Sequence, residues 1–85
     1  MDEIERDINE LVTIESEVLE LIAKLISKGH RPEGIAAVLA KTTYSLYKTL
    51  LPASDYEQMA AYLYDASPSV VSFTEIVSAH TRQLN

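Results

Sequence analysis

The first 28 residues contain neither glycine nor proline, and apolar residues return through them at heptad intervals. The main row consists of Ile4, Leu11, Val18 and Leu25, with Ile8 and Ile22 beside it. Such a row is the seam of an α-helix that packs lengthwise against another helix. The pattern therefore predicts one helix over residues 2–28, which Gly29 would end with Pro32 just beyond it.

The apolar band of this helix is wider in its second half. Val12, Leu19 and Ile26 add a further row there, and Ile14 and Leu21 add another, whereas Glu15 interrupts the row that contains Ile8 and Ile22. A band of this width has to be covered from two directions. We therefore expect the second half to be the more buried part of the helix.

The length of this helix conflicts with the size of the chain. A helix over residues 2–28 would extend about 40 Å, whereas a compact chain of 85 residues has a diameter of about 30 Å. Little of the chain remains to cover the N-terminal part, so we expect it to pair with the same helix of a second subunit, either parallel or antiparallel. The residues expected to form this oligomer interface are Ile4, Ile8, Leu11, Ile14 and Val18.

Three shorter helices are expected after Gly29. Helical spacing from Ile35 to Leu50 predicts a second helix over 32–51, and the capping box formed by Ser54 and Glu57 predicts a third over 55–66. A last helix over about 69–83 would begin at Pro68 or at a second capping box, Ser72 with Glu75. A strand over 71–77 is the alternative, but its alternation fails at Glu75.

These elements predict an all-α fold, with residues 1–85 as a single helical domain. A chain of this size hides only about 60–65% of its unfolded surface when it folds alone, and it has no cysteine for disulfides. We therefore expect homo-oligomerisation, as a homodimer or a higher oligomer, to complete the helical bundle.

Charge is concentrated at the N-terminus. The net charge of the chain is −6. Residues 1–20 hold eight acids against Arg6 alone, while residues 21–85 carry six bases and five acids. A phosphate backbone would be repelled by the first segment, and no basic stripe follows it, so nucleic acid is not an expected partner.

No segment of the chain predicts a membrane span. The longest uncharged run, Ala66 to Thr74, has nine residues, well under the roughly 20 residues that a spanning helix needs. The acidic N-terminus is also unlike a secretory signal. These features predict a cytoplasmic protein.

Residue types that carry chemistry are scattered. His30 and His80 are fifty residues apart, in no metal-binding spacing, and we expect both in loops or at the surface. The carboxylates of Glu10, Glu17 and Glu20 could share a helix face, but they lack the histidines and the second helix of a di-iron site. Without cysteine, a nucleophile elbow or a phosphate loop, the sequence predicts no enzyme, no metal and no cofactor.

Five tyrosines fall within 21 residues, from Tyr44 to Tyr64. Tyrosine is common where one end of the ring is buried and its hydroxyl meets water, so this stretch is typical of a core perimeter or of a recognition surface. Tyr44, Tyr47 and Tyr62 are the candidate contacts to an unknown protein partner.

Two other functions remain open. Ala36, Leu39, Ala40, Leu46 and Leu50 partly match a regulatory helix-turn-helix, but Lys41 occupies a position that should be apolar, and Lys48 is the only cation in the recognition segment. The charge on residues 1–20 suggests the second alternative, an acidic nucleic-acid mimic that inhibits a host protein.

A set of short markers also suggests an origin. Tyr47-Lys48-Thr49, Asp55-Tyr56, Met59, Asp65 and the Val71 to Phe73 segment occur in this order along the chain. Over residues 29–73 the chain thereby resembles small uncharacterised α-helical proteins of marine tailed phages and marine metagenomes. The resemblance implies a helical fold and a phage accessory protein, and it brings no catalytic residue with it. Together with the periodicity, it favours a non-enzymatic homo-oligomeric interaction protein.

Overall fold

The computed structural model describes residues 3–84, and all regular structure in this range is helical. Four α-helices follow one another, α1 (Glu3–Ser27), α2 (Pro32–Leu50), α3 (Ala53–Ala66) and α4 (Phe73–Leu84), with a 3₁₀ turn at Ser67–Ser69. The expected all-α class, with a long first helix and three shorter ones, is therefore confirmed. Residue 2, where the first helix was expected to begin, lies outside the described residues.

The helix α1 is unbroken over 25 residues, a length of about 37 Å. It ends in a Schellman motif, in which the Gly29 N–H donates to the Ile26 carbonyl at 2.9 Å and the His30 N–H to the Leu25 carbonyl at 3.1 Å. Gly29 has a φ of +94°, a left-handed conformation that other residues adopt at a cost. The first helix therefore ends at the predicted glycine.

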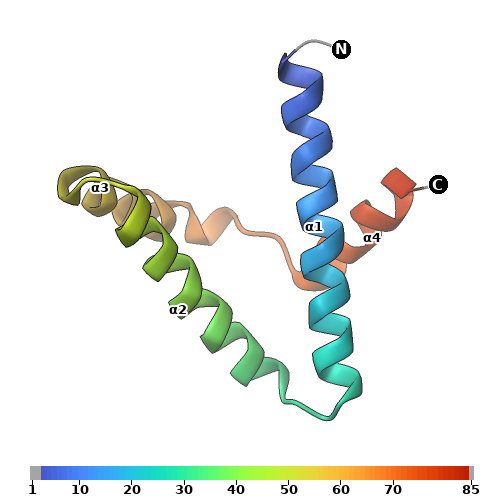
Figure 1. Ribbon diagram of the computed structural model, residues 1–85. Coiled ribbons are helices and arrows are strands. Elements are labelled where there is room, and N and C mark those ends of the chain that lie inside the picture. The colour runs from blue at the N-terminus through green and yellow to red at the C-terminus, as the bar shows by residue number, and fades with distance from the viewer. Residues whose placement is uncertain (1–2, 85) are drawn as a thin grey trace.

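The helices α1 and α2 form the two arms of a V whose vertex is the short connection after Gly29 (Figure 1). The helix α3 lies at the far end of α2, and the chain then returns so that α4 lies against the middle of α1 (Figure 1). The principal extents are 39 × 39 × 24 Å and the radius of gyration is 14.9 Å, against about 12 Å for a compact chain of this length. The fold of the chain is therefore open.

Two helix starts differ from their predicted positions. The helix α3 begins at Ala53, with Pro52 as its N-cap residue and no side-chain cap. Ser54 therefore lies inside the first turn, and the capping-box prediction for Ser54 and Glu57 is wrong. Pro52 already holds a fixed φ, and its carbonyl accepts the Tyr56 N–H at 2.9 Å.

The last helix begins at Phe73 rather than near residue 69, because Pro68 belongs to the 3₁₀ turn. Ser72 precedes the helix, and its Oγ accepts the Glu75 N–H at 3.2 Å, which is the N-cap contact that the second capping box predicts. Residues 73–77 are helical, so the strand alternative for them is wrong.

The helix α2 passes through Thr42, Thr43 and Tyr44 without a turn. A helix-turn-helix would need a break at this point, between a first helix and a recognition helix. The continuous apolar spacing from Ile35 to Leu50 explains why the segment stays helical.

Few side chains of the described residues are buried. Among the described residues only Ile35 and His80 are buried, with exposed fractions of 8% and 6%. The chain exposes 7223 Å², whereas a folded monomer of 9.5 kDa exposes about 5,000 Å². The chain therefore leaves about 2,200 Å² more surface in contact with solvent than a compact folded monomer of the same mass does.

Candidate functional site

An open apolar groove lies between the two arms of the V. We call it the V groove. Leu21 and Leu25 of α1 form one wall, Val38, Leu39 and Thr42 of α2 form the other, and most of the lining surface is apolar. The remaining lining residues are Ile22, Ile35 and Gly34, with His30 and Arg31 at the vertex.

The α1 wall of the V groove continues along the helix toward its N-terminus. Ile4, Leu11, Ile14 and Val18 precede Leu21 and Leu25 at spacings of three, four and seven, so they share a face with these lining residues. Ile4 is 71% exposed and Leu11 is 66% exposed. We call Ile4, Ile8, Leu11, Ile14 and Val18 the α1 stripe. All five side chains, which were expected to form an oligomer interface, are exposed in this structure.

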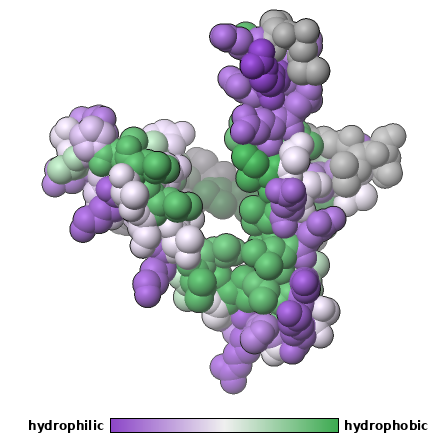
Figure 2. All heavy atoms as spheres, viewed as in Figure 1, coloured by the Kyte–Doolittle hydropathy of each residue, from purple (hydrophilic) through white to green (hydrophobic). Residues whose placement is uncertain are grey.

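The α2 wall also continues beyond the groove. Leu46 follows Thr42 by four residues and Leu50 follows Leu46 by four, so both lie on the helix face that lines the groove. Leu46 is 57% exposed and Leu50 is 73% exposed. Figure 2 shows apolar residues on the facing sides of α1 and α2 and hydrophilic residues at the free end of α1.

The floor of the V is hollow where a small protein normally has its core. A second apolar hollow lies among Ile26, Ile35, Leu39 and Phe73, and a third lies between α1 and α4 beside Val77. Ile22 lines all three hollows. Protein interiors are close-packed, whereas these side chains surround unfilled space.

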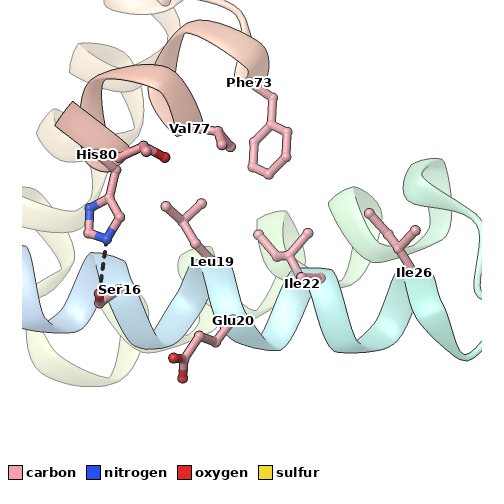
Figure 3. Close-up of a pocket in the computed structure, with 10 residues that line it drawn as sticks. Ser16, Leu19, Glu20, Ile22, Ile26, Phe73, Val77 and His80 are labelled. Carbon is pink, nitrogen blue, oxygen red and sulfur yellow. Dashed lines mark hydrogen bonds between the residues drawn. The ribbon is translucent and has the colours of Figure 1, made fainter. Parts of the chain in front are cut away.

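His80 joins α4 to the middle of α1. Its Nδ1 lies 3.0 Å from Glu15 Oε1, and its Nε2 lies 2.9 Å from Ser16 Oγ (Figure 3). Because a carboxylate only accepts hydrogen bonds, Nδ1–H donates to Glu15, and in the neutral ring Nε2 accepts from the Ser16 hydroxyl. The expectation that His80 is a loop or surface residue is wrong. Both of its ring nitrogens have partners on α1, and Phe73 and Val77 line the hollow beside it.

The order serine, histidine and carboxylate is the connectivity of a nucleophilic triad. Here, however, Ser16 lies in the interior of an unbroken α-helix, so the backbone N–H groups around it are used in the helix itself. Acyl transfer needs free donors where the oxyanion develops. We therefore interpret this cluster as a polar tie that holds α4 on α1, and the absence of enzyme activity stays a prediction.

The other candidate residues lie elsewhere. Tyr44 and Tyr62 are exposed and Tyr47 is half-buried, and all three lie outside the lining of the V groove. Their binding to a protein partner stays a prediction. His30 is exposed, as expected.

Within residues 3–84, no three histidine or acidic side chains converge in a way that could hold a metal ion. None of the helices described for this range has the length and apolar character needed to cross a membrane. Comparisons with protein families, curated proteins and solved structures return no match for this chain.

Proposed function

We propose that this chain is a non-enzymatic, homo-oligomeric helical interaction protein, with the phage accessory role in the cytoplasm that the sequence suggests. The excess exposed surface of about 2,200 Å² per protomer is the observation that carries the proposal. Two protomers that cover this excess would bury about 4,400 Å² between them, which falls in the range of obligate homodimers.

The composition of the exposed surface also supports self-association. Monomeric proteins rarely expose contiguous apolar patches of more than a few hundred Å². Here the α1 stripe, the V groove and the exposed Leu46 and Leu50 follow one another along the inside of the V. Homodimer interfaces are similarly apolar at their centres.

A pair of charge substitutions on α1 tests the proposal. Leu11→Glu puts a carboxylate in the centre of the α1 stripe, whereas Thr13→Glu puts the same charge two residues away on the opposite face. Thr13 is exposed and bonds only to the Asn9 carbonyl of its own helix, at 3.0 Å. Neither change removes packing that would hold the isolated protomer together.

We expect sedimentation velocity to show an oligomer for the Thr13→Glu variant and a large loss of association for Leu11→Glu, because an unpaired carboxylate is costly to bury. Equal sedimentation of both variants as oligomers would show that α1 does not carry the association. A monomeric unsubstituted chain at micromolar concentration would overturn the proposal.

A further inference from the structure

We infer that the V groove of each protomer receives the N-terminal half of α1 from a second copy of the chain, with the two α1 helices antiparallel. The inference rests on the proposed self-association and adds the segment that binds, the surface that receives it and the direction of pairing. It also assigns partner contacts to Val38, Thr42 and Leu46 of α2.

The shape of the protomer favours this arrangement. The arms of the V meet after Gly29 and diverge from there (Figure 1), so the two apolar walls face each other across a space that no part of the described chain fills. An inserted helix could contact both walls at once. The first turns of α1 carry an exposed apolar face, and none of the other described helices lies beside them (Figure 1).

Antiparallel insertion is reciprocal under two-fold symmetry. If the partner's α1 enters the groove with its N-terminus toward the vertex, a two-fold axis places the N-terminus of the first α1 at the partner's vertex. Each α1 stripe is then covered by the other protomer's groove, as an isologous interface requires. The arrangement closes at two copies.

Charge selects the same direction. The free end of α1 carries Glu3, Glu5, Asp7 and Glu10 against Arg6. The vertex of the V carries Lys24, Lys28 and Arg31 against Glu33, and Arg31 lines the groove itself. Antiparallel insertion brings the acidic end to the basic vertex, whereas parallel pairing of α1 would place one acidic end beside the other, which is unfavourable.

The exposed area points to the groove as well. Simple side-by-side pairing of two α1 helices would cover the α1 stripe and leave Val38, Leu46 and Leu50 of α2 exposed. Insertion into the V covers both walls together. This agrees with the excess of about 2,200 Å² of exposed surface per protomer. Gly34 supports a close approach, because an added Cβ there would meet nothing of its own chain within 4 Å.

Disulfide cross-linking tests the arrangement, since the chain has no cysteine of its own. Glu3→Cys marks the free end of α1 and His30→Cys marks the vertex. Within one chain these positions are separated by the length of α1, about 37 Å, whereas a disulfide needs Cα atoms within about 7 Å. A bond between the two marked positions would therefore join two chains.

The two single variants are mixed in equal amounts, refolded together so that protomers exchange, and oxidised. We expect the mixed disulfide dimer to dominate over both same-variant dimers, as identified by intact mass. Glu3→Cys mixed with Tyr64→Cys measures collisional cross-linking, because Tyr64 is exposed on α3 away from the groove.

Each other outcome overturns the inference. Dominant Glu3→Cys homodimers would show parallel pairing, and mixed dimers no more abundant than the Tyr64→Cys background would show that the groove is not occupied by the end of α1. In both cases, an oligomer of the unsubstituted chain in sedimentation leaves the proposed function standing, whereas a monomer removes both.

Discussion

Replacement of His80 by alanine should weaken the docking of α4 on α1 while α1 and α2 remain helical. His80 is the buried polar side chain of α4, and its two ring nitrogens contact Ser16 and Glu15 of α1. The apolar side chains of α4 are less buried, since Phe73 and Val77 remain substantially exposed and Ile76 is half-buried. The polar tie therefore accounts for a large share of the docking of α4.

The size of the effect follows from the two bonds. The bond to Ser16 contributes about 1 kcal/mol, and the hydrogen bond to Glu15 adds about 1 kcal/mol or less, because that carboxylate is half exposed and regains water when His80 is removed. A loss of about 2 kcal/mol corresponds to a roughly 30-fold change in the opening equilibrium of α4.

Amide hydrogen exchange measures that opening directly. In the His80→Ala variant we expect the amides of α4 to exchange about 30 times faster than in the unsubstituted chain, with α2 amides unchanged. His30→Ala is the matched control, because His30 is exposed at the vertex, and it should leave exchange in α4 unchanged. Unaltered exchange in α4, or an equal acceleration in α2, would refute the role assigned to the tie.

Three further substitutions have defined outcomes. Gly29→Ala should lower the free energy of unfolding by about 1–2 kcal/mol in urea titration, because φ is +94° there; an unchanged midpoint would contradict this. Ser72→Ala should cost about 1 kcal/mol through loss of the α4 N-cap, seen as faster exchange confined to the first turn of α4. Gly34→Leu should weaken self-association by filling the V groove, where an added Cβ meets nothing of its own chain within 4 Å, whereas Ala37→Leu, outside the groove lining, should not; equal sedimentation of both would exclude the groove as the interface.

Heptad spacing alone predicted the most distinctive element of the fold. The row from Ile4 to Leu25 predicted an unbroken helix, and Gly29 predicted where it ends. The apolar spacing is lost at Gly29, which adopts the left-handed conformation that commonly ends a helix. The exposed α1 stripe was likewise predictable, since too little chain remained to cover it. These are local properties, and local properties are what a sequence pattern records.

The tie between α4 and α1 was not predicted, because its partners lie 64 and 65 residues apart. One signal did exist, since Glu15 interrupts an otherwise apolar row and a carboxylate at such a position needs a polar partner. The partner's identity depends on where α4 docks, and helical spacing does not specify docking. For the same reason the angle of the V, and with it the groove, could not be predicted from periodicity.

Sedimentation equilibrium of the unsubstituted chain is the most direct test of self-association. Across low to high micromolar concentrations we expect a mass of twice 9.5 kDa, because two V-shaped protomers that exchange their α1 ends form a closed pair. A mass that stays at 9.5 kDa over the whole range would contradict the account, since the exposed inside of the V would then have no second copy to cover it.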